Sequence, residues 1–167
     1  MKSKITWGTI CKVTFALILV TALFSCKKNP PPPDNSGYNL NVSLVGDNKT
    51  GPKSYGYIEF RQDPDTARII DLNTWVYHLE ANHSYLLQRA VNLITDPDCS
   101  STAWLTLGIG LQPQAIITDS HGDGHADLWR AVTSIARGTQ FHIHFQIIDA
   151  TTLSTVLTSG CYDYTVR

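Results

Sequence analysis

The sequence lacks a long apolar run and an excess of positive charge. Its longest apolar stretch, residues 13–24, has roughly 12 residues, whereas a helix needs about 20 to cross a bilayer. The chain carries 13 Lys plus Arg against 14 Asp plus Glu, and no basic cluster is interleaved with aromatic residues. These absences make a permanent transmembrane helix the weaker interpretation and exclude nucleic acid as an expected partner.

The N-terminus has the order of segments that is typical of a signal peptide. Three lysines in the first 12 residues precede the apolar stretch, and Ser25-Cys26 follows it. The junction Leu23-Phe-Ser-Cys26 resembles the lipobox of bacterial lipoproteins. This resemblance implies a signal peptide over 1–25 and a lipid on Cys26 that anchors the protein to a membrane. An ordinary signal peptide that is cut near Ser25 is the alternative.

The segment after Cys26 reads Lys-Lys-Asn-Pro-Pro-Pro-Pro-Asp-Asn-Ser-Gly and has no apolar periodicity. Four consecutive prolines favour polyproline II, at about 3.1 Å per residue. We therefore expect a lipidated cysteine and Pro-rich linker over 26–37 and one domain over 38–167. Lys27 stands where lipoproteins of enteric bacteria carry an aspartate retention signal, which favours the outer membrane of the cell envelope and leaves the face open.

The chain has only four cysteines, and the N-terminal pair is accounted for. Cys11 lies in the signal peptide, and Cys26 takes the lipid. Cys99 and Cys161 remain, and a disulfide between them is the expected state in an oxidising compartment. Two buried thiols or a metal site are the alternatives.

The spacing of a buried helix face is missing from the domain, whereas apolar and polar residues alternate with period two throughout. Turn-forming residues separate the alternating segments, for example Gly46-Asp-Asn and Ser120-His-Gly-Asp-Gly124. Many short strands at such spacing predict an all-β, antiparallel sandwich or barrel. The expected strands are Tyr38 to Val45, Tyr55 to Arg61, Ala67 to Leu72, Thr74 to Glu80, Ser84 to Val91, Ala103 to Gly108, Gln114 to Thr118, Asp127 to Thr133, Phe141 to Asp149, Leu153 to Leu157 and Cys161 to Val166.

Several motifs resemble, in order, those of the Cu/Zn superoxide dismutase family. They are Gly56-Tyr-Ile-Glu-Phe60, the segment from Val76 to Gln88, and Thr118-Asp-Ser-His-Gly-Asp-Gly-His-Ala-Asp127. Cys99 and Cys161 are similarly placed to the disulfide cysteines of that family. The resemblance implies a superoxide dismutase-like Greek-key β-barrel over most of residues 56 to 166.

The metal ligands of the family are mostly missing. Leu86, Leu87 and Gln88 fall on its copper-binding H-V-H motif, and leucine is not a copper ligand. Thr158 stands where the family has its anion-guiding arginine. The chain is therefore not expected to be an enzyme of this kind, and no G-x-S-x-G elbow or other nucleophile suggests a different one.

Four histidines are the candidate metal ligands. His144 falls on a copper-ligand position of the family, and His142 shares its face of the strand because side chains alternate. His121 and His125 flank the glycine turn and could complete a zinc or copper site. The alternative is that His142 and His144 lie on the polar outer face of a half-buried strand. No cofactor is expected, although copper or zinc is a possible ligand of these histidines.

The leading functional prediction is a membrane-tethered, non-catalytic module that binds an unidentified ligand or envelope protein. A copper- or zinc-binding envelope protein is the first alternative. A carbohydrate-adhesion module is the second, and it requires several aromatic side chains exposed on one face. The aromatic candidates are Tyr57, Trp75, Tyr77, Tyr85, Trp104 and Trp129.

Overall fold

A computed structural model describes residues 37–46, 53–96 and 98–167. The expected signal peptide, Cys26 and the linker up to residue 36 lie outside these ranges. Within the described ranges all regular elements are strands, and no helix is long and apolar enough to cross a membrane. The prediction of an all-β domain is confirmed.

Twelve strands follow one another along the described chain. They are β1 (Leu40–Val45), β2 (Tyr55–Gln62), β3 (Ile69–Tyr77), β4 (Ser84–Leu93), β5 (Leu105–Thr106), β6 (Gly108–Ile109), β7 (Gln112–Pro113), β8 (Ala115–Ile117), β9 (Gly124–Ala131), β10 (Gln140–Asp149), β11 (Thr155–Ser159) and β12 (Tyr162–Thr165).

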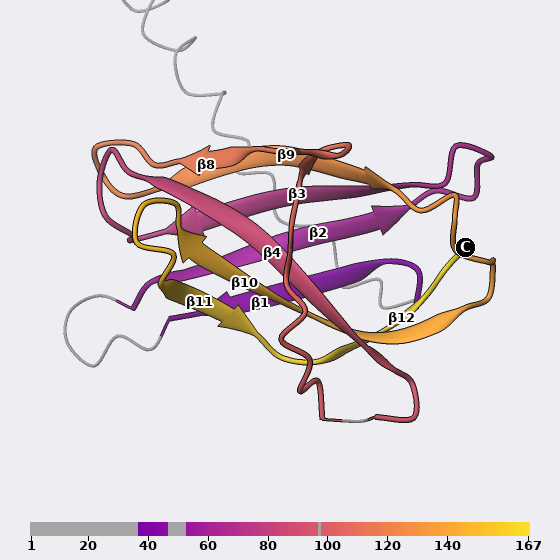
Figure 1. Ribbon diagram of the computed structural model, residues 1–167. Helices are drawn as coiled ribbons and strands as arrows, with labels where there is room; N and C mark the ends of the chain where they lie inside the picture. The colour runs from indigo at the N-terminus through magenta and orange to yellow at the C-terminus, as the bar shows by residue number, and fades with distance from the viewer. Residues whose placement is uncertain (1–36, 47–52, 97) are drawn as a thin grey trace, which may run out of the picture. The chain divides into compact units, whose positions relative to one another are not determined.

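The strands form one sheet that curls into a nearly closed barrel. Along the sheet the order is β5-β4-β10-β11-β1-β2-β3-β9-β6-β7, with β12 paired to β10 and β8 paired to β4. A bridge between Thr118 and Gly124 links the end of β8 to β9. Because β8 contacts both β4 and β9, it brings the two sides of the sheet together (Figure 1).

The connections follow a Greek-key pattern. Strands β1, β2 and β3 are consecutive neighbours, but the chain then crosses the barrel to β4, which pairs with β10. It returns through β8 to β9, which lies beside β3. All named pairs are antiparallel except the short contact of β6 with β9. The expected antiparallel Greek-key barrel is therefore the observed architecture.

The period-two pattern of the sequence defines the barrel interior. Along β2 the inward side chains Ile58 and Phe60 are almost fully buried, while the alternate side chains face outward. Val42 of β1, Val76 of β3 and Ile147 of β10 meet them in the core. The whole apolar core lies between Leu40 and Val166, so residues outside this range contribute nothing to it within the described chain.

One predicted break does not exist. The expected strands Ala67 to Leu72 and Thr74 to Glu80 form the single strand β3, Ile69–Tyr77. Asn73, which separates the two expected segments, lies on the outer face and pairs with Glu59 and Asp127 on the neighbouring strands. Strand formation tolerates this asparagine because its side chain is not required to enter the core.

Candidate functional site

His142 and His144 lie on the outer face of β10, as the alternation predicts, but a loop covers them. The described parts of this loop are residues 94–96 and 98–104, and the second part carries Cys99. His142 Nε2 lies 3.2 Å from the Ile94 carbonyl oxygen, and His144 Nε2 lies 3.1 Å from that of Ser101. The Trp104 ring lies 4.7 Å from the His144 ring, centroid to centroid. These two histidines hold the loop against the barrel.

The electrostatics of this pair agree with a structural role. Burial lowers the pKa of His144, and the bond to the Ser101 carbonyl opposes that shift. His144 is therefore neutral at pH 7 and donates from Nε2. His142 Nδ1 lies 2.7 Å from the Asp163 carboxylate on β12, which is an ion-pair distance, but this nitrogen makes no hydrogen bond.

His121 and His125 lie elsewhere on the barrel. The His121 side chain is 82% exposed in the β8–β9 turn, and His125 stacks on Trp75. Strands β9 and β10 are separated by β8 and β4, so their outer faces do not meet. The structure therefore does not bring the four histidines together. Among the described residues no three His, Cys, Asp or Glu side chains are grouped so as to hold a metal ion.

The disulfide prediction is confirmed. Cys99 and Cys161 are bonded, with their Cα atoms 5.8 Å apart. The bond joins the covering loop to the residue that precedes β12. Together with His142 and His144, the disulfide fixes this loop over β10. The loop therefore covers the face of β10 on which the sequence predicts a possible copper or zinc site.

The opposite side of the barrel carries an aromatic face, which we define as Tyr55, Tyr57, Trp75, Tyr77 and His125. Tyr57 lies opposite Trp75, and Trp75 lies opposite His125, on three adjacent strands. The ring centroids are 4.6 Å apart in each pair, with interplanar angles of 18° and 23°. Tyr55 stacks on Tyr77 in the next row at 4.9 Å. The five rings form one continuous ladder.

A row of polar side chains borders the ladder on the same outer face. Asn41, Glu59, Asn73 and Asp127 lie side by side on β1, β2, β3 and β9. We call Asn41, Glu59, Asn73 and Asp127 the polar row. His125 Nε2 lies 3.1 Å from Asp127 Oδ1, and this contact connects the polar row to the rings. Amide and carboxylate groups of β2, β3 and β9 therefore lie two residues along each strand from an aromatic side chain, on the same face.

A shallow groove of about 470 Å³ lies at the end of the ladder. Trp75, Tyr77 and His125 line one side, and the β8–β9 turn with Asp119 and Asp123 lines the other. Asp119 Oδ1 accepts hydrogen bonds from the backbone N–H groups of Asp123 and His121, which lower the pKa of this carboxyl. The groove wall is thus acidic at neutral pH.

The turn that forms the groove is set by Gly122. Its φ of +82° suits glycine, and a Cβ there would lie 2.0 Å from the Leu79 carbonyl oxygen. The Leu79 N–H donates to the Gly122 carbonyl at 3.0 Å. This close approach packs the turn against the end of β3, where Asp123 Oδ1 accepts a hydrogen bond from the His78 backbone N–H at 3.1 Å.

The sequence predicts Tyr57, Trp75 and Tyr77 as aromatic candidates and does not single out Tyr55. The i, i+2 spacing of Tyr55 with Tyr57 and of Trp75 with Tyr77 indicates that each pair shares a face. The spacing does not reveal the register of β2 with β3, which places the two pairs opposite each other. No protein-family model, curated protein sequence or solved structure matches this chain, so the chemistry of the site is the basis for a functional proposal.

Proposed function

We propose that this chain is a non-catalytic, lipid-anchored module of a bacterial cell envelope that binds saccharide chains on its aromatic face. The observation that carries the proposal is the five-ring ladder beside a row of amide and carboxylate groups. Sugars present both C–H surfaces and hydroxyl groups. Aromatic rings contact the former, and planar polar side chains bind the latter.

The ladder is ordered before any ligand arrives. Each ring is fixed against a neighbour across the strands, so binding immobilises few side chains and loses little conformational entropy. Tyr55 is 44% exposed at the edge of the ladder, and the groove continues from its other end. Burial raises the pKa of Tyr57, and the nearby phenol of Tyr77 raises it further, so this phenol stays neutral and able to donate.

The charges around the ladder select the kind of saccharide. Glu59 and Asp127 border it, and Asp119 and Asp123 line the groove. Negative groups repel acidic polysaccharides, so the face favours neutral sugars. An anchor at Cys26 with an extended linker would hold the domain away from the bilayer, within reach of glycans of the envelope or of its surroundings.

The resemblance to the superoxide dismutase family remains a proposal about ancestry. A Greek-key barrel is the architecture that this resemblance implies. The positions of its copper ligands serve other purposes here: Leu86 is half-buried on β4, between Ala115 of β8 and Ile148 of β10, and Gln88 accepts a hydrogen bond from Gln146 at 2.7 Å. These contacts support a binding module and not an oxidoreductase.

A glycan array with the chain from Lys27 to Arg167 tests the function, because this chain retains the whole core. We expect binding to neutral glycans that Trp75→Ala and Tyr55→Ala abolish or weaken at least tenfold. Trp104→Ala is the matched control, since Trp104 lies over His144 on the other side of the barrel. Glycan binding that survives both ladder variants, or no binding to any neutral glycan, would overturn the proposal.

The anchor is tested separately in the full chain. Metabolic labelling with a palmitate analogue should label the wild type in membranes and leave Cys26→Ser unlabelled. A labelled Cys26→Ser chain, or an unlabelled wild type, would show that Cys26 is not the lipidated residue.

A further inference from the structure

The barrel interior contains two arginines at positions that the alternation reserves for the core. Along β4 the inward series is Tyr85, Leu87, Arg89 and Val91, and along β9 Arg130 follows the inward residue Leu128. Arginine is rarely placed inward unless it is paired, because removing an unpaired charge from water is costly. Here two such residues face the same space.

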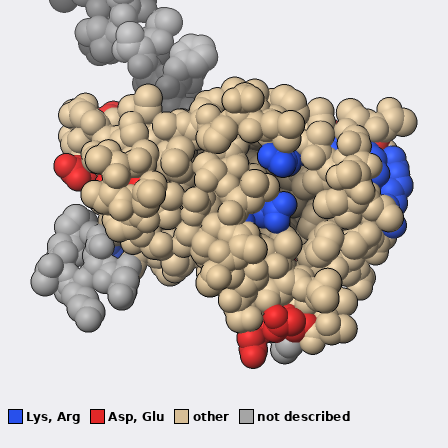
Figure 2. Space-filling model, in the orientation of Figure 1, with Lys and Arg blue, Asp and Glu red and all other residues tan. Residues whose placement is uncertain are grey.

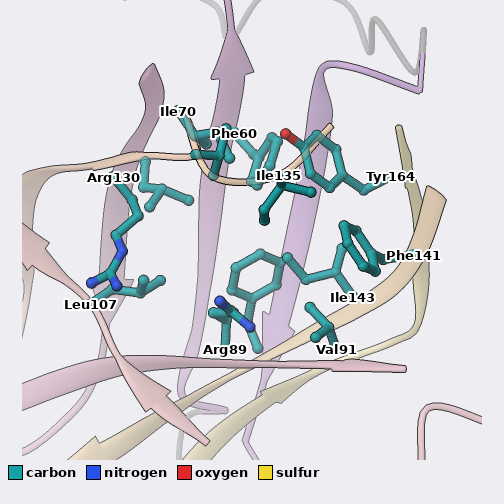
Figure 3. A pocket seen from close by; sticks show the side chains of 13 residues that line it. Phe60, Ile70, Arg89, Val91, Leu107, Arg130, Ile135, Phe141, Ile143 and Tyr164 are labelled. Carbon is teal, nitrogen blue, oxygen red and sulfur yellow. The ribbon is translucent and has the colours of Figure 1, made fainter. Parts of the chain in front are cut away.

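That space is an apolar pocket of about 70 Å³. Its wall combines side chains of β2, β3, β4, β10 and β12, among them Phe60, Ile70, Val91, Phe141 and Tyr164. Arg89 and Arg130 are the two charged members of the lining, and Figure 3 shows their guanidinium groups on one side with the hydrocarbon wall opposite. On the face seen in Figure 2, blue basic side chains border a hollow near the centre of the molecule.

Neither guanidinium has an acidic partner within the part of the chain that the structure describes. The ion pairs there all join a histidine to an aspartate. Arg130 donates one long bond of 3.4 Å to the Gly110 carbonyl. Burial lowers the pKa of Arg89, and the positive charge of Arg130 lowers it further. The two cations therefore repel each other, and an anion bound between them would relieve this repulsion.

The polar atom of the remaining wall already has a partner, because the Tyr164 hydroxyl donates to Gln62 Oε1 at 2.8 Å. A ligand that fits must consequently be anionic at one end and apolar over the rest. Two arginine forks suit a planar carboxylate, to which guanidinium groups bind through paired N–H donors.

We propose that this pocket binds a small amphiphilic carboxylate, with its head group held by Arg89 and Arg130 and its hydrocarbon chain between Phe60, Val91 and Phe141. The site is separate from the aromatic face and does not depend on saccharide binding. The volume limits the chain, because it is about half that of the ~150 Å³ apolar cavity that takes up benzene. A few methylene groups enter, and the head group remains at the opening.

Calorimetric titration of the chain from Lys27 to Arg167 with octanoate tests the proposal. One equivalent should bind, while acetate, which lacks the tail, and octanol, which lacks the charge, should bind at least tenfold more weakly. From butanoate upward each methylene that enters the pocket should tighten binding roughly fourfold until the pocket is full. Octanol binding as tightly as octanoate, or octanesulfonate binding more tightly, would overturn the assignment of a carboxylate to the arginines.

Variants separate the head group from the tail. Arg89→Gln and Arg130→Gln should each weaken octanoate binding roughly tenfold or more, as the loss of a hydrogen bond to a charged group predicts. Val91→Phe keeps both arginines but fills the pocket, and it should abolish binding of the longer acids. Arg137→Gln is the matched control, because Arg137 is exposed outside the pocket and its loss removes the same charge. Equal affinity in Arg89→Gln and Arg137→Gln would refute the site.

Discussion

Tyr57 and Trp75 lie directly opposite each other on β2 and β3, with ring centroids 4.6 Å apart and 18° between the ring planes. Both rings are half-buried on the outer face of the barrel, so their contact adds to the stability of the domain as well as forming the centre of the proposed binding surface. Such a contact has an energy of its own, beyond the area that each ring buries.

A double-mutant cycle measures that energy. We expect Tyr57→Ala and Trp75→Ala to be less destabilising together than the sum of the two single changes, with a coupling of about 0.5–1.5 kcal/mol, as found for aromatic pairs. Urea unfolding of the four proteins provides the values. Additive effects would show that the two rings stabilise the sheet independently.

The fold could be predicted from the sequence to the extent that side-chain alternation determines it. The series Phe141, Ile143, Phe145 and Ile147 alternates strictly, and β10 follows with the inward residues Ile143, Phe145 and Ile147 buried. The alternation also placed His142 and His144 on the outer face. It could not reveal that residues 94–96 and 98–104 cover them, because a loop has no periodicity and its path depends on contacts with distant residues.

The arginines illustrate the opposite case. Arg89 and Arg130 interrupt apolar inward series, and this local conflict between charge and core position was present in the sequence. The conflict alone does not predict a shared site for the two arginines, because only the strand register of the barrel brings them to one pocket. Side chains that violate the pattern of their strand are therefore the ones whose purpose depends on the tertiary structure.

The disulfide should stabilise the domain strongly. The bond between Cys99 and Cys161 spans a sequence separation of 62 residues, for which the chain-entropy model gives about 4 kcal/mol. The double variant Cys99→Ser/Cys161→Ser should lose roughly that amount in urea unfolding. Reduction of the wild type should produce the same loss, and the variant should not respond to the reductant. A variant as stable as the wild type would contradict the prediction.

Loss of the bond should also loosen the covering loop. Hydrogen exchange should accelerate at residues 98–104 in the variant, while β2 and β3, on the other side of the barrel, should keep their protection. Uniform acceleration throughout the barrel would indicate global destabilisation and no local effect of the disulfide on the loop.

Acid should unfold the domain through carboxylates that are hydrogen-bonded in the folded state. The Thr152 backbone N–H at 2.8 Å, the Thr151 N–H at 2.7 Å and His83 Nε2 at 2.7 Å all face the Asp149 carboxylate and lower its pKa, with Thr152 as the largest cause. The unfolded chain therefore binds a proton at a higher pH than the folded one. The stabilisation is present above the ordinary aspartate pKa of about 4 and is lost as the pH falls below it.

Urea unfolding between pH 7 and pH 2 should thus show stability falling on the acid side. Asp149→Asn should be less stable than the wild type at pH 7 and should have a flatter pH profile, because it cannot take up the proton. Asp98→Asn serves as the control for the loss of one carboxylate, since Asp98 is exposed. A profile of Asp149→Asn that is parallel to that of the wild type would show that Asp149 is not one of the groups responsible.

The empty domain should become more stable when Arg89 is replaced by leucine. Arg89 occupies an inward position between Leu87 and Val91, has no acidic partner among the described residues, and lies near the like charge of Arg130. Leucine removes the repulsion and fills apolar space, so we expect Arg89→Leu to raise the free energy of unfolding by on the order of 1 kcal/mol. Most core substitutions have the opposite effect.

Urea unfolding without added carboxylate measures the change, and Arg137→Leu controls for the general loss of positive charge. A stabilised Arg89→Leu domain that no longer binds octanoate is the signature of an arginine retained for a ligand, whereas a destabilised one would show that Arg89 supports the fold itself.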